Sequence, residues 1–165
     1  MNTTEATISY YNHNTDKFIQ ETGNLQFSSV QEMFLQYVPD GGLILDLGCG
    51  SGRDSKVFLE KGYRIVAVDG SEKMCRAARE YIGHPVICSL FQTYQPAEKF
   101  DGIWACASLL HLQEKDIISV IRKMSNALKV NGVFYMSFKY GIGAEMRLGR
   151  YYTDFTEDTM QNMIR

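Results

Sequence analysis

Residues 43–55 read LILDLGCGSGRDS, and this stretch decides the fold. An apolar strand pattern that contains Asp46 passes directly into a turn with glycine at three alternate positions, Gly48, Gly50 and Gly52. A glycine-rich turn between a strand and a helix lets the backbone approach a ligand closely and points free N–H groups toward it. We therefore expect residues 48–52 to form a ligand-binding turn.

The same alternation of strand and helix patterns continues along the chain. Strand patterns occupy residues 43–47, 63–68, 85–88, 100–107 and 132–138, and helix patterns occupy residues 54–61, 71–81 and 114–129. Strands that alternate with helices form a parallel sheet covered on both faces, with right-handed crossovers. The sequence predicts an α/β fold, a doubly wound and mostly parallel sheet of about five strands with helices on both faces.

Two helix patterns flank this core. Residues 29–38 predict a helix with Ser29 and Glu32 at capping-box spacing. Its expected apolar face consists of Val30, Met33, Phe34 and Tyr37. Near the other end, the apolar stripe of helix 114–129 includes Leu128, an Asn131-Gly132 turn leads into the last strand, and Thr156 caps a final helix.

The chain length fits one domain, since 165 residues lie within the usual size range of single domains. We divide that domain into an N-terminal helical lid or cover at residues 1–38, a core sheet at 43–139, and a loop with the last helix at 140–165. No repeat or low-complexity segment interrupts it.

Composition excludes several kinds of partner. With 17 Lys and Arg against 19 Asp and Glu and no basic run, nothing indicates nucleic acid binding. The N-terminus lacks the apolar region of a secretory signal, and the longest apolar run is far shorter than the ~20 residues of a membrane span. The four cysteines form no CxxC pair, so we expect reduced, buried thiols, no metal site and a cytoplasmic location.

The charged residues around the turn indicate the ligand. Asp46 and Asp54 flank it, and because like charges repel, two carboxylates make a poor cradle for a pyrophosphate and suit a ligand with a positive end. Asp69 ends the second strand, before Gly70 and the probable helix cap Ser71, where a carboxylate can accept both ribose hydroxyls. A nucleoside that carries an amino acid combines these features, and S-adenosylmethionine is that molecule.

Three segments resemble the cofactor motifs of class I S-adenosylmethionine-dependent methyltransferases, which have a Rossmann-like fold. They are LILDLGCGSGRDS, IVAVDGSEKM and FDGIWACASLLHL, in that order. The resemblance spans roughly residues 10–160, and the tail SFKYGIGAEMRLGRYYTDFTEDTM resembles a small bacterial subgroup near the tellurite-resistance type. Family members normally continue with two more strands that this sequence lacks. Strand 133–139 is then expected to be an open edge, either of a short chain or covered by a homodimer or another partner.

The resemblance implies roles for individual residues. The backbone of residues 48–50 would lie against the methionine moiety, Asp69 would bind the ribose, Met74 would pack near the adenine, residues 105–107 would lie beneath the methyl group, and Tyr10 or Tyr11 would close the site. The predicted cofactor-binding residues are Tyr11, Asp46, Gly48, Cys49, Gly50, Asp54, Asp69, Gly70, Ser71, Met74, Phe91, Gln92, Ala105, Cys106 and Ala107.

Some of these positions have an equally open structural interpretation. Asp54 can be a first-turn carboxylate favoured by the helix dipole, and Met74 can be an ordinary core residue. The acidic residue that many family members carry after the third strand is absent, because Cys88 and Ser89 stand there. Adenine recognition then falls to the backbone of residues 90–91 or to Gln92.

The expected function is transfer of a methyl group to a small-molecule acceptor, with S-adenosylhomocysteine as the product. The protein must mainly align the reactants, so a base is optional. His111 is the candidate base, although a hydrogen-bonded support for its loop is preferred. Arg147 and Arg150 can hold an anionic acceptor or a lid carboxylate. The alternative, which we favour, is that both are simple solvated charges. The alternative function is a weak or inactive S-adenosylmethionine-binding module that acts through a partner or dimer; a nicotinamide oxidoreductase is disfavoured by the glycine spacing.

Overall fold

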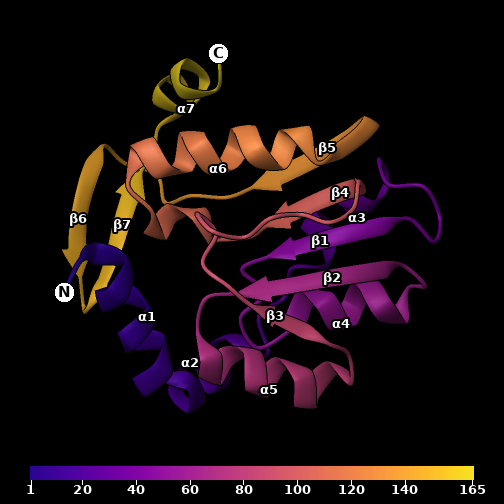
Figure 1. The fold of residues 1–165 in the computed structure, drawn as a ribbon, viewed down its shortest axis with the longest axis horizontal. Helices are drawn as coiled ribbons and strands as arrows, with labels where there is room; N and C mark the ends of the chain where they lie inside the picture. Colours follow the sequence, from indigo (N-terminus) through magenta and orange to yellow (C-terminus); the bar gives the residue numbers. More distant parts are fainter.

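A five-stranded parallel sheet forms the centre of the computed structural model, which describes all 165 residues (Figure 1). The strand order is β3-β2-β1-β4-β5, and every neighbouring pair is parallel. The strands are β1 (Leu43–Leu47), β2 (Arg64–Asp69), β3 (Val86–Cys88), β4 (Phe100–Ala105) and β5 (Leu128–Met136). The order reverses beside β1, as in doubly wound folds. The predicted fold class is confirmed.

Seven helices surround the sheet, together with a short 3₁₀ helix, η1 (Leu109–His111). They are α1 (Thr3–His13), α2 (Thr15–Thr22), α3 (Ser28–Leu35), α4 (Arg53–Glu60), α5 (Glu72–Ile82), α6 (Glu114–Asn126) and α7 (Glu157–Ile164). The predicted caps of α5 and α7 are confirmed, since the Ser71 and Thr156 side chains accept hydrogen bonds from backbone N–H groups in the first turn. None of these helices is long and apolar enough to cross a membrane.

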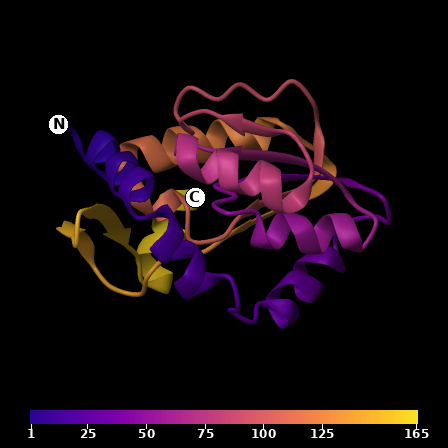
Figure 2. The same cartoon turned by 90° about the horizontal axis from the view of Figure 1, so that it is seen from below.

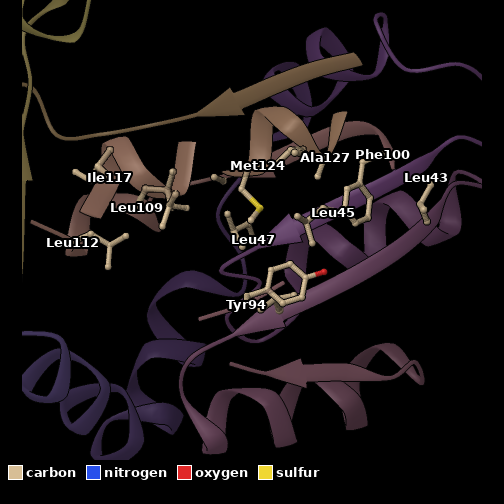
Figure 3. Packing of buried hydrophobic residues seen from close by; sticks show 14 of the residues in the cluster. Leu43, Leu45, Leu47, Tyr94, Phe100, Leu109, Leu112, Ile117, Met124 and Ala127 are labelled. Carbon is tan, nitrogen blue, oxygen red and sulfur yellow. The ribbon is translucent and has the colours of Figure 1, made fainter. Parts of the chain in front are cut away.

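Each face of the sheet carries its own apolar core, because successive side chains of a strand point to opposite faces. On one face Leu43, Leu45 and Leu47 pack with side chains of α6 such as Ile117 and Met124 (Figure 3). On the other face Ile44 packs with residues of α3, α4 and α5. All five residues of β1 are therefore buried, which fixes this strand and the turn that follows it.

The packing of α3 differs from the prediction. Met33 and Tyr37 are 52% and 66% exposed, and the buried side chains of this helix are Gln31 and Phe34. Phe34 contacts Trp104 of β4 with ring centroids 5.1 Å apart. The expected capping box is also absent, since α3 starts after Phe27 without a side-chain cap. A buried polar residue, Gln31, shifts the inward face of this helix away from its most apolar stripe.

The transition from α6 to β5 also corrects the sequence analysis. Helix α6 ends at Asn126, and Leu128 begins β5 rather than completing the helical stripe. Asn131 has a φ of 65°, and the β4–β5 register shifts near it, between the Phe100 and Gly102 pairs. The predicted turn is a bulge inside a longer strand. β5 lies at the outer edge of the sheet, and what covers that edge stays a prediction.

A β-hairpin occupies part of the segment for which only a loop was expected. Strands β6 (Gly143–Arg147) and β7 (Arg150–Asp154) pair antiparallel and form a separate two-stranded sheet. Leu148 and Gly149 connect them with φ values of 48° and 85°, the left-handed pair that a two-residue hairpin turn requires. Figures 1 and 2 show the hairpin beside α1, at the carboxyl ends of the core strands.

Substitution of Gly52 by alanine tests how tightly the turn packs on α5. A Cβ at Gly52 would lie 2.7 Å from Ile82 Cγ2, whereas Gly62 has the same kind of backbone, with φ of +88° against +89°, and nothing within 4 Å. Both alanine substitutions lose roughly 1–2 kcal/mol to the left-handed backbone. Gly52→Ala should lose about 1–3 kcal/mol more through overpacking. Urea unfolding of both variants measures the difference, and equal losses would contradict this packing.

Candidate functional site

A cavity of about 360 Å³ lies between the carboxyl ends of β1, β2 and β4 on one side and α1, α2 and β7 on the other. Of the predicted site residues, thirteen line it: Tyr11, Gly48, Cys49, Gly50, Asp54, Asp69, Gly70, Met74, Phe91, Gln92, Cys106, Ala107 and His111. Three others, Asp46, Ser71 and Ala105, do not line it. Segments separated by up to a hundred residues thus meet in one pocket.

Four of the five backbone N–H groups of the glycine turn, residues 48–52, already have acceptors. Gly48 N and Cys49 N both donate to the Val68 carbonyl oxygen, at 2.8 and 3.0 Å, and Gly50 N donates to Asp69 Oδ2 at 2.9 Å. Gly52 N donates to the Cys49 carbonyl oxygen. The expectation of free N–H groups aimed at a ligand is therefore wrong for these four residues. The donors of these four residues are not available to a pyrophosphate.

The glycines are required by protein packing as well as by the cavity. All three have positive φ. A Cβ at Gly48 would lie 2.3 Å from Ser108 Cβ, and one at Gly52 would meet Ile82 of α5. At Gly50 the nearest atom to a Cβ would be a ring carbon of Phe18 at 3.6 Å. Gly52 thus packs against a helix, and Gly48 and Gly50 form the wall of the cavity.

Asp69 holds the turn against the start of α5. Its two oxygens accept hydrogen bonds from Gly50 N and Ser71 N, both at 2.9 Å. Burial raises the pKa of this carboxyl, and the backbone donors partly oppose that rise. Each carboxylate oxygen can accept a second hydrogen bond, so Asp69 keeps acceptor capacity toward the cavity that it lines.

Asp46 and Asp54 form hydrogen bonds with side chains next to the turn. Ser55 Oγ donates to Asp46 Oδ2 at 2.6 Å, and burial together with the neighbouring Asp54 raises the pKa of Asp46 to about 8. Asp54 accepts hydrogen bonds from Gln31, Arg53 and Trp104, with distances between 2.7 and 3.1 Å. Both carboxylates therefore stabilise the turn and the adjoining α3 and β4.

The segment after β4 forms another wall of the cavity. Ala107 has a φ of 49°, and its N–H donates to Ser137 Oγ at 2.8 Å. Ser108 Oγ donates to the Leu47 carbonyl oxygen at 2.6 Å, which ties this segment to the end of β1. A strained residue beside a cavity is typical of functional sites.

The cysteines are not all buried as predicted. Cys49 and Cys75 are buried, Cys106 is half-buried in the cavity wall, and Cys88 is exposed at the end of the short strand β3. No group of three or more His, Cys, Asp and Glu side chains has the arrangement of a metal site.

Gln92 has an unusual hydrogen-bonding state. Its Nε2 donates to Thr4 Oγ1 of α1 at 3.3 Å, but its Oε1 is buried without a partner. A buried acceptor without a donor costs free energy. Gln92 lines the cavity with Met74 and Phe91, so a ligand that offers an N–H group there would remove this cost.

His111 connects three elements that line the cavity, η1, α1 and β7. Its Nδ1 lies 2.7 Å from the Tyr151 carbonyl oxygen, which can only accept, so Nδ1 carries the proton and Nε2 accepts from the Tyr11 hydroxyl at 2.8 Å. Burial lowers the pKa of His111 to about 4 and raises that of Tyr11 to about 12. The imidazole is therefore neutral at pH 7 and joins η1 to α1 and β7.

Arg147 and Arg150 are not the solvated charges that we favoured. Arg147 binds both oxygens of Asp154 and also Glu145. Arg150 lies over the rings of Tyr10 and Tyr152, with its guanidinium carbon 4.5 and 5.4 Å from their centroids. The two arginines thus take part in the packing of the hairpin.

The sequence analysis missed several cavity residues that belong to α1, α2 and β7. Phe18 and Thr22 of α2, Thr4 and Thr7 of α1, and Tyr152 of β7 line the cavity. Phe18 stacks edge-on against Tyr11 with centroids 5.3 Å apart. None of these residues follows a core strand, the position at which ligands bind in doubly wound sheets, so position along the chain carried no signal for them.

The histidine bridge predicts a specific pH dependence. Between pH 6.5 and about 4 the unfolded chain protonates His111 and the folded chain does not, so its stabilising contribution falls as the pH falls. The free energy of unfolding of the unchanged chain, relative to His111→Gln, should shrink by up to about 3 kcal/mol over this range. Urea unfolding of both chains at pH 7 and pH 4.5 measures it; a difference that does not change with pH would contradict the bridge.

Comparisons with known proteins agree with this arrangement. A family model described as a methyltransferase domain matches residues 44–132. The putative methyltransferase YqeM of Bacillus subtilis (strain 168) is 32% identical over 114 residues, which cover 62% of this chain and 46% of YqeM. The chain thus spans about half the length of this relative.

Solved structures with this fold are more distant in sequence. An S-adenosylmethionine-dependent methyltransferase from Clostridium acetobutylicum ATCC 824 superposes with a TM-score of 0.71 at 18% identity, covering 94% of this chain and 85% of that one. TehB from Haemophilus influenzae gives 0.70 at 18% identity, covering 92% and 54%. The family resemblance expected from the three motifs is confirmed. The chain belongs to the methyltransferase domain family and has the fold of the class I S-adenosylmethionine-dependent methyltransferases.

Proposed function

We propose that the chain binds S-adenosylmethionine in the cavity and transfers its methyl group to a small molecule. The observation that carries this proposal is the glycine turn, whose N–H donors are bonded to β2 and to Asp69. Such a turn offers carbonyl oxygens and nearby carboxylates to its ligand, which favours a positively charged amino acid over a phosphate. Membership of a methyltransferase family supports the same assignment.

The cofactor has a distinct set of residues for each of its parts. The turn at Gly48–Gly50 lies at the methionine end, and Asp69 accepts hydrogen bonds from the ribose hydroxyls. Met74 and Phe91 pack against the adenine, and the unpartnered Gln92 Oε1 accepts a hydrogen bond from its amino group. This acceptor replaces the acidic side chain that is absent after β3, and the adenine amino group supplies the donor that the buried oxygen lacks.

The protein contributes alignment and exclusion of water. S-adenosylmethionine supplies a methyl group already activated on sulfonium. Helices α1 and α2, within the lid at residues 1–38, cover the cavity with Tyr11 and Phe18. A cavity of about 360 Å³ lies within the size range of small-molecule sites, which supports a small-molecule cofactor there.

His111 acts as a positioning residue in this proposal. Both ring nitrogens have partners within the chain, so neither is available to an acceptor while Tyr11 stays in place. The imidazole holds Tyr11 over the cavity. The earlier candidate role as a general base is therefore not part of the proposed mechanism.

Cofactor binding can be tested by calorimetric titration with S-adenosylhomocysteine. Asp69→Asn should weaken binding by roughly 10- to 100-fold, or about 1–3 kcal/mol, because one carboxylate acceptor is lost. Asp101→Asn is the matched control. Asp101 bonds Leu43 N and Lys129 at the opposite end of the sheet, so this variant should bind like the unchanged chain.

A folded chain that does not bind S-adenosylhomocysteine would refute the proposed function. A chain that binds it but transfers no methyl group from S-adenosylmethionine to any acceptor in a broad screen would instead support the non-catalytic binding module.

A further inference from the structure

Arg150 has no anionic partner although it lines the cavity. It forms no ion pair, and its Nε is buried without a hydrogen-bond partner. The other two arginines of this region differ, since Arg53 pairs with Asp54 and Arg147 with Asp154. A buried donor without an acceptor costs free energy, so an acceptor brought by a ligand would be favourable at this position.

The position of Arg150 is fixed by its neighbours on both sides. The next residue, Tyr151, donates its N–H to Thr7 Oγ1 at 3.0 Å and accepts from His111 Nδ1 at 2.7 Å. A Cβ on the preceding Gly149 would lie 3.1 Å from the Tyr10 ring. The backbone is thus held by α1 and η1, and the guanidinium lies against three tyrosine rings, with centroids 4.5 to 5.8 Å away. This arrangement is a preorganised cation rather than a mobile surface charge.

Charge is distributed unevenly around the cavity. The carboxylates of Asp54 and Asp69 lie at the glycine turn, and hydrogen bonds within the chain hold both. Lys139 lines the cavity near the hairpin, is exposed and forms no ion pair. Two unpaired cations therefore stand on the part of the wall formed by residues 139–152, whereas the carboxylates lie at the glycine turn.

We propose that the methyl acceptor is a small acid whose carboxylate or phosphate group binds to Arg150. This inference rests on the proposed function, and it names the class of acceptor that function leaves open. The guanidinium offers two parallel N–H donors to such a group, and the unpartnered Nε is one of them. Tyr11 and Tyr152, which line the cavity with it, provide apolar contacts for the rest of the acceptor.

The test uses the chain saturated with S-adenosylhomocysteine and three probes of similar shape. Benzoate, phenyl phosphate and the neutral benzamide are titrated by calorimetry. At least one of the two anions should bind about tenfold more tightly than benzamide, or more, and the comparison of the two anions identifies the group that Arg150 prefers. Arg150→Gln should remove this preference. Arg76→Gln changes the net charge equally on a side chain that is 80% exposed and should keep it.

The outcomes separate this inference from the proposed function. Failure of S-adenosylhomocysteine to bind the unchanged chain refutes the proposed function itself. If it binds, but neither anion binds more tightly than benzamide, or Arg150→Gln keeps the preference, the inference is wrong. If Arg150→Gln does not fold, Arg150→Lys is measured instead. Lysine keeps the charge without paired donors, so a retained preference for the anion with weaker anion binding supports the inference. An affinity for the anions equal to that of the unchanged chain overturns it.

Discussion

The two hydrogen bonds from Gly48 N and Cys49 N to the Val68 carbonyl oxygen are the constraint on which the site depends. They fold the turn back onto β2, and Asp69 completes the closure by accepting from Gly50 N. The positive φ values of the glycines make this path accessible. A turn closed in this way has fewer donors for phosphate oxygens, because the N–H groups of Gly48, Cys49 and Gly50 are already bonded. The same doubly wound architecture that binds dinucleotides elsewhere is thereby specialised for a different nucleoside.

The carboxylates that surround the turn have separate tasks. Asp46 supports the turn from below through Ser55, and burial with a neighbouring carboxylate keeps its pKa high, near 8. Asp54 joins α3 to β4 through Gln31 and Trp104. Asp69 alone combines a structural role with open acceptor capacity toward the cavity. The division explains how three buried acids coexist within one small region, because each has hydrogen-bond donors of its own.

Much of the fold could be predicted from the sequence, and so could the part of the site that follows the core strands. Short apolar runs and helical patterns locate β1, β2 and α5, and Asp69 stands at the end of the second strand as expected. The N-terminal helices and the C-terminal hairpin were less predictable. Leu148-Gly149 is not a common hairpin pair, so β6 and β7 were missed, and the inward face of α3 depends on a partner of Gln31 that lies 23 residues away. The contacts of His111 and Arg150 likewise join elements distant in sequence, which local patterns do not encode.

The account's central claim is that the closed turn selects a cationic amino-acid nucleoside and rejects a pyrophosphate. The most direct measurement is a pair of calorimetric titrations of the unchanged chain, one with S-adenosylmethionine and one with NADH, which shares the adenosine group. We expect S-adenosylmethionine to bind more tightly by roughly 100-fold, since the N–H groups of Gly48, Cys49 and Gly50 are not available to phosphate oxygens and the Asp69 carboxylate repels them. Binding of NADH as tight as that of S-adenosylmethionine would contradict the claim.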